Sequence, residues 1–147
     1  MLSEIAEWLP ERSFHLSGDG AYASLLGYAL PRTEVTGRIR RDAAIYEPAP
    51  ARTGKPGRPA TRGKKLPKPA ELATKVRKRD WQSVVVDERH RGVEKLVYTQ
   101  DVLWYNPQQL VRLTIVRDPA GKCPDDFFVT TDLSATGADT AARYASR

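Results

Sequence analysis

The spacing of apolar residues in the first forty positions changes between helical and strand periodicity. Residues 2–9 place their apolar side chains on one helical face, which predicts a short amphipathic helix. Residues 13–17 alternate apolar and polar side chains and predict a strand that ends in a glycine-rich turn. A helix is expected over 21–30 and a second strand over 34–40. This order of strand, tight turn, helix and strand is typical of the start of an α/β layer.

The middle of the chain lacks a regular hydrophobic period. Residues 48–69 hold six of the eleven prolines, together with several glycines and many lysines and arginines. Such a composition excludes a helix or a central strand and predicts a linker or an exposed arm. Residues 69–76 are expected to form a helical turn or two.

The second half of the chain has the pattern of short strands joined by turns. Apolar and β-branched side chains predict strands over 81–86, 93–99, 102–105, 110–117 and 127–131. Turns are expected at 87–92 and 118–121, so consecutive strands would pair in an antiparallel sheet. A last helix is expected over 138–147. The expected fold class is therefore α/β, in the α+β sense of a partly antiparallel sheet.

Length and composition limit the class of protein. A chain of 147 residues, 40% hydrophobic and 29% charged, is sufficient for one domain with a modest core. No apolar run approaches the roughly 20 residues that a membrane span needs. The N-terminal residues lack the basic and apolar pattern of a signal peptide, and the single cysteine, Cys123, excludes an internal disulfide. The cytoplasm is the expected location, and no membrane partner is expected.

Positive charge is concentrated in one segment. Between Arg52 and Arg79 there are eleven Lys/Arg and one acid, Glu71, whereas the rest of the chain has thirteen basic and seventeen acidic residues. A concentrated cationic stretch favours a polyanion partner such as DNA, because each neutralised phosphate releases condensed counterions. A solvated linker, kept soluble by its charge, is the alternative, and composition alone leaves both interpretations open.

The clearest candidate for chemistry is Asp19, which stands between Gly18 and Gly20 after a predicted strand and before a predicted helix. Ligands of open α/β sheets gather at the carboxyl ends of strands, and a carboxylate there suits a hard cation such as Mg²⁺. Alternatively, Asp19 caps the following helix while the two glycines shape the turn. The local pattern by itself favours the cap, and the two roles are compatible.

The remaining reactive residues give weaker signals. His15 and His90 are far apart in the sequence and neither is paired with a cysteine, so a zinc site is not predicted. Cys123 has no identifiable base near it and is not expected to be a nucleophile. Trp81, Trp104 and Tyr105 fall at strand positions, where core packing is favoured over stacking on bases.

Several segments resemble, in order, bacterial insertion-sequence transposases of the DDE type. The segment Phe14–Ser24 is similar to the region around the second catalytic aspartate of that family. The next core strand of the family resembles Thr36–Tyr46, and its basic Pro/Gly insert resembles Thr53–Pro59 with Gly63–Pro67. Parts of its β-rich insertion resemble Leu103–Tyr105 and Val116–Gly121, and its return to the core resembles Thr131-Asp132. The resemblance covers nearly the whole chain, and it is carried by the order and spacing of these segments together.

The resemblance implies an RNase H-like core interrupted by a β-rich insertion. It also implies three carboxylates that hold two Mg²⁺ or Mn²⁺ ions for the cleavage and transfer of DNA strands. By that match Asp19 would be a catalytic residue and a metal ligand. The implied organisation begins with a partial core over residues 1–47 and a basic linker or arm over 48–80. An antiparallel β-rich insertion over 81–131 and a return to the core with a truncated helix over 132–147 follow.

The first catalytic aspartate and the final glutamate of the family have no counterpart in this sequence. Neither Asp132 nor Asp139 occupies the position of that glutamate. The resemblance therefore implies an internal fragment that does not cleave DNA by itself. A core without its first strand would expose a sheet edge, which is a setting for self-association.

Basic side chains near Asp19 and in the cationic segment are the expected DNA contacts. The spacing of Arg38 and Arg40 places both on one strand face, for which a solvated edge is the alternative explanation. The complete set of expected nucleic-acid-binding residues is Arg38, Arg40, Arg41, Arg58, Lys64, Lys65, Lys78 and Arg79. Two functions are thus expected from the sequence: a fragment of a DNA transposase, or a non-catalytic basic DNA-binding module.

Overall fold

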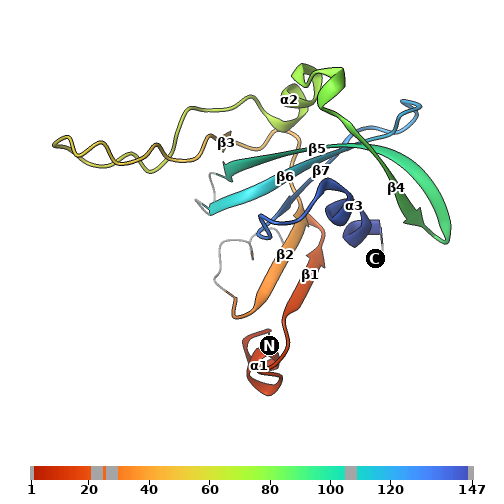
Figure 1. Ribbon diagram of the computed structural model, residues 1–147, viewed down its shortest axis with the longest axis horizontal. Coiled ribbons are helices and arrows are strands. Elements are labelled where there is room, and N and C mark those ends of the chain that lie inside the picture. Colours follow the sequence, from red (N-terminus) through yellow and green to blue (C-terminus); the bar gives the residue numbers. More distant parts are fainter. Residues whose placement is uncertain (1, 21–24, 26–29, 105–108, 146–147) are drawn as a thin grey trace.

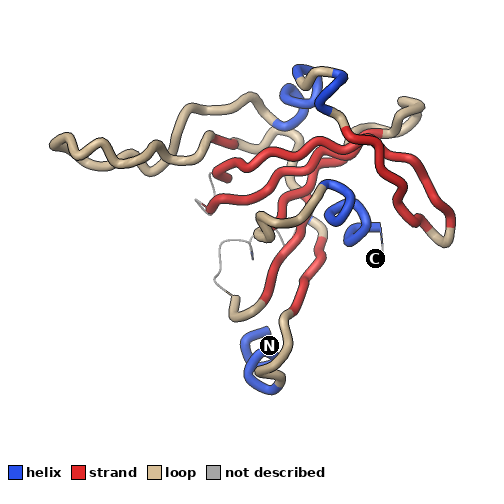
Figure 2. The backbone as a smooth tube through the Cα atoms, viewed as in Figure 1, coloured by secondary structure: helices blue, strands red, loops and turns tan. Residues whose placement is uncertain are grey.

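The computed structural model describes residues 2–20, 25, 30–104 and 109–145. In this part of the chain, three α-helices accompany a seven-stranded, mostly antiparallel sheet (Figures 1 and 2). The chain is therefore mixed α/β, as the hydrophobic pattern predicts. None of the helices that the structure describes is long and apolar enough to cross a membrane.

The helices are short and the strands carry most of the fold. The α-helices are α1 (Leu2–Trp8), α2 (Pro69–Lys75) and α3 (Gly137–Ala145). A short 3-10 turn, η2 (Lys78–Asp80), follows α2. Strands β1 to β7 span Phe14–Gly18, Thr33–Arg38, Ile45–Tyr46, Gln82–Glu88, Arg91–Trp104, Gln109–Arg117 and Asp126–Thr130. The helix start at Pro69 follows from the fixed φ of proline, which suits the first turn of a helix.

The strands form one continuous sheet. Their order is β1-β2-β7-β6-β5-β3, and β4 also pairs with β5. β1 and β2 are parallel, whereas the other strand pairs within the described residues are antiparallel. Because β7 lies between β2 and β6, strands from both sides of the basic segment share the same sheet.

Some predicted boundaries differ from the structure. As far as Trp104, the strands expected over 93–99 and 102–105 are one strand, β5, because the polar residues between them stay in the ladder; Tyr105 lies outside the described residues. Asp101, for example, accepts hydrogen bonds from Nε and Nη2 of Arg112 on β6, at 2.8 and 3.2 Å. Most of the helix expected over 21–30 lies outside the described residues.

Each face of the sheet buries its own hydrophobic cluster. The face under α2 is formed by Val35, Ile39, Ile45, Val102, Val111, Leu113, Ile115, Phe127 and Val129, with Ala73 of the helix. On the opposite face, Val97, Val116 and Phe128 pack against Ala141 and Tyr144 of α3. The ring centroids of Phe128 and Tyr144 are 4.4 Å apart. Alternate side chains of each strand therefore serve opposite layers.

A reciprocal cap fixes the start of α3. The backbone N–H of Thr136 donates to Asp139 Oδ2 at 3.0 Å, and the N–H of Asp139 donates to Thr136 Oγ1 at 3.1 Å. This arrangement satisfies two N–H groups that the helix itself leaves free. The helix start is also pressed against the sheet, since a Cβ added to Gly137 would lie 2.7 Å from Val97 Cγ2.

Candidate nucleic-acid interface

Asp19 lies where two parallel strands end. β1 and β2 run side by side with Gly18 opposite Gly37, so Asp19 follows the end of β1 at the level of Arg38, the last residue of β2. Gly20 stays near β2, since a Cβ added to it would lie 3.8 Å from the carbonyl oxygen of Arg38. The carboxylate-bearing residue is exposed. The fold thus brings the candidate carboxylate and a basic residue to one end of a parallel strand pair.

The described residues bear differently on the two roles expected for Asp19, metal ligand and helix cap. Within residues 2–20, 25, 30–104 and 109–145, no three His, Cys, Asp or Glu side chains are grouped so that they could hold a metal ion. A two-metal centre takes carboxylate oxygens from several residues, so the described residues do not fit one, and no chemical step is assigned to a metal. The capping role depends on a helix over 21–30, most of which lies outside the described part.

Two of the three arginines at the end of β2 are bound to aspartates. Arg38 donates a hydrogen bond to Asp126, which raises the pKa of Arg38. Arg40 donates to both carboxylate oxygens of Asp42 at 3.0 Å, which lowers the pKa of that carboxyl. β2 ends at Arg38, so the strand expected over 34–40 is two residues too long at this end, although Arg38 and Arg40 are both exposed on either side of the buried Ile39. Arg41 makes no side-chain hydrogen bond or ion pair among the described residues and is available to an external anion.

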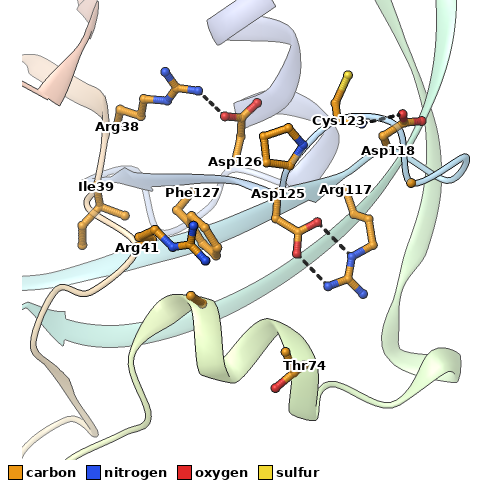
Figure 3. Close-up of a pocket in the computed structure, with 13 residues that line it drawn as sticks. Arg38, Ile39, Arg41, Thr74, Arg117, Asp118, Cys123, Asp125, Asp126 and Phe127 are labelled. Carbon is orange, nitrogen blue, oxygen red and sulfur yellow. Dashed lines mark hydrogen bonds and ion pairs between the residues drawn. The ribbon is translucent and has the colours of Figure 1, made fainter.

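A cavity of about 640 Å³ lies beside the end of β2, and Arg41 is part of its wall (Figure 3). Most charged groups around it are paired, since Asp125 binds Arg117 and Asp126 binds the arginine that ends β2. The thiol of Cys123 is exposed at this cavity, and no histidine is among the lining residues. Among the described residues that line it, the cavity therefore offers one available guanidinium and no histidine beside the thiol.

Arg117 holds the wall of this cavity together. Its Nε and Nη2 donate to the two oxygens of Asp125 at 2.9 and 2.7 Å, and Nη2 also donates to the carbonyl of Ala73 in α2 at 3.2 Å. The guanidinium lies 4.3 Å from the centroid of the Trp81 ring, which packs against the core. These contacts engage Nε, Nη2 and one face of the guanidinium, so we assign Arg117 a structural role rather than an anion-binding one.

The most exposed cationic surface is the basic arm, which we define as residues 48–65. It carries six lysines and arginines and no acidic residue. Every residue from 48 to 62 is exposed, and the segment extends alone beyond the edge of the sheet (Figure 1). Its prolines and positive-φ glycines, Gly54 and Gly57, prevent regular helix or strand formation. The basic arm is thus open to a large polyanion from more than one side.

The base of the basic arm is anchored by backbone hydrogen bonds. The N–H of Glu47 donates to the carbonyl of Lys64 at 2.8 Å, and the N–H of Gly63 donates to the carbonyl of Glu47 at 2.9 Å. The guanidinium of Arg62 lies 4.3 Å from the centroid of the Tyr46 ring. Since β3 pairs with β5, these contacts connect the arm to the main sheet. The arm therefore leaves the body in a defined direction.

The predicted basic residues are divided among separate places in the structure. Beside β2 lie Arg38, Arg40 and Arg41, in the arm lie Arg58, Lys64 and Lys65, and in η2 lie Lys78 and Arg79. Sequence reasoning missed Tyr46 and Gly63, which hold the base of the arm. Their role comes from pairing across the whole arm, and an aromatic residue before a Pro/Gly-rich stretch with a glycine after it is a weak local signal.

No protein-family model, curated protein or solved structure matches this chain. Asp19 at the end of β1, the available Arg41 and the exposed basic arm are the features of the molecule that bear on its function.

Proposed function

We propose that this chain binds DNA through the basic arm, as part of a DDE-type transposase. The observation that carries the proposal is the exposed arm itself, with six cationic side chains, no acid and an anchored base. A cationic segment held away from the body reaches a phosphate backbone without steric conflict. Release of counterions from the phosphates then supplies the free energy of binding.

The transposase part of the proposal is supported by the order of elements around Asp19. A strand that ends in a carboxylate, a parallel neighbouring strand and a later antiparallel β-rich region follow one another as the resemblance implies. In this proposal Asp19 supplies one carboxylate of the RNase H-like centre, and the other two come from outside the present sequence. Mg²⁺ or Mn²⁺ would be held by all three together.

Salt dependence of DNA binding tests the role of the basic arm. For a labelled duplex of random sequence, the double variant Lys55→Gln/Arg58→Gln should flatten the plot of log K against log salt by about two units, at about 0.9 per lost phosphate contact. The matched control is Arg12→Gln/Lys122→Gln, which removes the same net charge from exposed positions outside the arm. An arm variant with the slope of the wild type would refute the proposal.

A free-standing, non-catalytic DNA-binding module is the second candidate, and the same arm supports it. The DNA that flanks the coding sequence separates the two candidates. An upstream strand-end aspartate and a downstream helix with a glutamate, in the same or a shifted frame, would support the transposase. Flanking DNA without such coding segments would support the module. In a nuclease assay with Mg²⁺ or Mn²⁺ the chain alone should be inactive, and cutting that depends on Asp19 would contradict the fragment interpretation.

A further inference from the structure

The middle of the basic arm contains two consecutive copies of one three-residue pattern. Gly54-Lys55-Pro56 is followed directly by Gly57-Arg58-Pro59, so each cation stands between a glycine and a proline. Both glycines have positive φ, 70° for Gly54 and 128° for Gly57, which glycine adopts without the strain that a Cβ brings. Apart from its chain neighbours, a Cβ added to either would meet no described atom within 4 Å. The glycines therefore set the path of the backbone and leave it uncovered beside each cation.

This part of the arm is narrow. Besides the three cations Arg52, Lys55 and Arg58, residues 48–61 are only proline, alanine, threonine and glycine, and all of them are exposed. The two branches of the arm share no backbone hydrogen bond over these residues, and an open space of about 680 Å³ lined by residues 49–61 lies between them. Each branch is thus a single chain, and its only long side chains are cationic.

The charge of this segment has one sign. Residues 48–65 contain no acid, and the acidic residue that comes first on the N-terminal side, Glu47, lies at the base of the arm. Arg52, Lys55 and Arg58 make no hydrogen bond or ion pair with a described residue. Their charges are therefore uncompensated within the described part of the protein, and they are available to an anionic surface that a narrow chain can enter.

We infer that the two triplets enter the minor groove of A·T-rich DNA, with Arg58 directed at the floor of the groove. The inference rests on the proposed DNA binding and names the kind of DNA that the arm prefers. The major groove, about 12 Å wide, accommodates a helix or a two-stranded ribbon, and residues 48–62 form neither. The minor groove is about 6 Å wide, and arginine-bearing arms occupy it in other DNA-binding proteins.

The preference for A·T pairs follows from the groove itself. Runs of A·T pairs have a narrow minor groove with an enhanced negative potential, which attracts arginine. A G·C pair places the N2 amino group of guanine, a hydrogen-bond donor, in the same groove, where it opposes another donor. Arg58 suits the floor better than Lys55 does, because a guanidinium is more weakly hydrated than an ammonium group and loses less on leaving water. Lys55 would contact phosphates at the rim.

Three duplexes of equal length test the inference, one with A·T pairs, one with G·C pairs and one with inosine·cytosine pairs at the centre. Inosine has the major-groove acceptors of guanine but lacks its minor-groove amino group. The wild-type protein should bind the A·T and inosine·cytosine duplexes with similar affinity. It should bind the G·C duplex roughly 5- to 150-fold more weakly, the range that one unfavourable base pair typically produces.

A charge-conserving substitution tests the role of the arginine. Arg58→Lys keeps the charge of the arm, so the salt slope should equal that of the wild type, whereas the discrimination against the G·C duplex should fall. The matched control is Arg52→Lys, the same change in the arm outside the triplets, which should keep the discrimination. An Arg58→Lys variant that discriminates as the wild type does would overturn the assignment of Arg58 to the groove floor. Since the arm belongs to neither hydrophobic cluster, both variants should melt at the temperature of the wild type.

The outcomes separate this inference from the proposed function. If the wild type binds all three duplexes equally while Lys55→Gln/Arg58→Gln still flattens the salt slope, the arm binds phosphates without entering the minor groove, and only the inference is overturned. A preference for A·T pairs that inosine·cytosine pairs do not share would point to the major groove and would also overturn it. If the double variant keeps the slope of the wild type, DNA binding by the arm is refuted and the inference fails with it.

Discussion

Gly63 is the position at which a single methyl group should disturb the basic arm without changing its charge. An added Cβ would lie 2.6 Å from the carbonyl oxygen of Pro48 and 2.9 Å from the carbonyl oxygen and Cβ of Glu47. Atoms essentially never approach a Cβ that closely, and backbone atoms cannot rotate away as a long side chain does. The substitution Gly63→Ala should therefore separate the two branches at the base of the arm.

The contacts at the base set the size of the effect. Separation breaks the hydrogen bonds between Gly63 and Glu47 and between Glu47 and Lys64, each worth about 0.5–1.5 kcal/mol. It also weakens the contact of Arg62 with the Tyr46 ring, worth about 0.5–1 kcal/mol at an exposed site. The local loss is roughly 2–3 kcal/mol. The base lies outside both hydrophobic clusters, so we expect local opening rather than global unfolding.

Amide hydrogen exchange and DNA binding together measure this effect. The amides of Glu47 and Gly63 should exchange roughly 30- to 150-fold faster in the variant, the factor that corresponds to 2–3 kcal/mol of local opening. The melting temperature should stay close to that of the wild type. DNA affinity should fall while the salt slope stays the same, because every cation remains. Gly20→Ala is the control, since its Cβ would meet its nearest neighbour at an ordinary 3.8 Å. Unchanged exchange at the base would show that the arm is not anchored as described.

Three further predictions concern stability. Gly137→Ala should destabilise the protein by about 1–3 kcal/mol in urea unfolding, because the new Cβ would overlap Val97, and an unchanged midpoint would show that α3 does not press on β5. Thr114→Val should leave stability unchanged or raise it by up to about 1 kcal/mol, since the buried Thr114 hydroxyl has no partner among the described residues; a clear loss would reveal a missed hydrogen bond. The hydrogen bond from the N–H of Thr136 lowers the pKa of Asp139, so this carboxylate stabilises the fold above its unfolded pKa near 4 and ceases to do so as the pH falls through the folded value. Melting curves should show the wild type losing its advantage over Asp139→Asn as the pH falls below about 4, and a constant difference would contradict this.

Much of the fold follows from local sequence signals. Proline at position 69 marks the start of α2, and alternating apolar residues mark β1, β2 and the strands after Trp81. The merging of two expected strands into β5 could not be read locally, because Asp101 looks like a break until Arg112 is placed opposite it. Polar residues within a ladder depend on partners that a one-dimensional pattern does not contain.

In the candidate interface, too, composition predicts some features, whereas others depend on residues that are distant in the sequence. The cationic segment is visible in composition, and residues 48–62 of it are exposed, whereas Pro69 and Ala73 further along are buried in α2. The availability of individual arginines could not be predicted, since Arg38 is engaged by Asp126, 88 residues away. Nor does the sequence distinguish a linker from an anchored arm, because the ladder joins Glu47 to Gly63 and Lys64 across the whole segment. Pairing over such separations is decided by tertiary structure.

The seam between β2 and β7 has a consequence for the growing chain on the ribosome. Thr36 and Thr130 are joined by a buried hydrogen bond of 2.9 Å between hydroxyl groups, although they are 94 residues apart. At about 5–20 residues per second, synthesis reaches the second threonine roughly 5–20 s after the first. Throughout that interval β2 has an unsatisfied edge that later belongs to the centre of the sheet. The nascent chain closes its sheet at this seam, and until then the backbone N–H and C=O groups on this edge of β2 are open to a chaperone or to another chain.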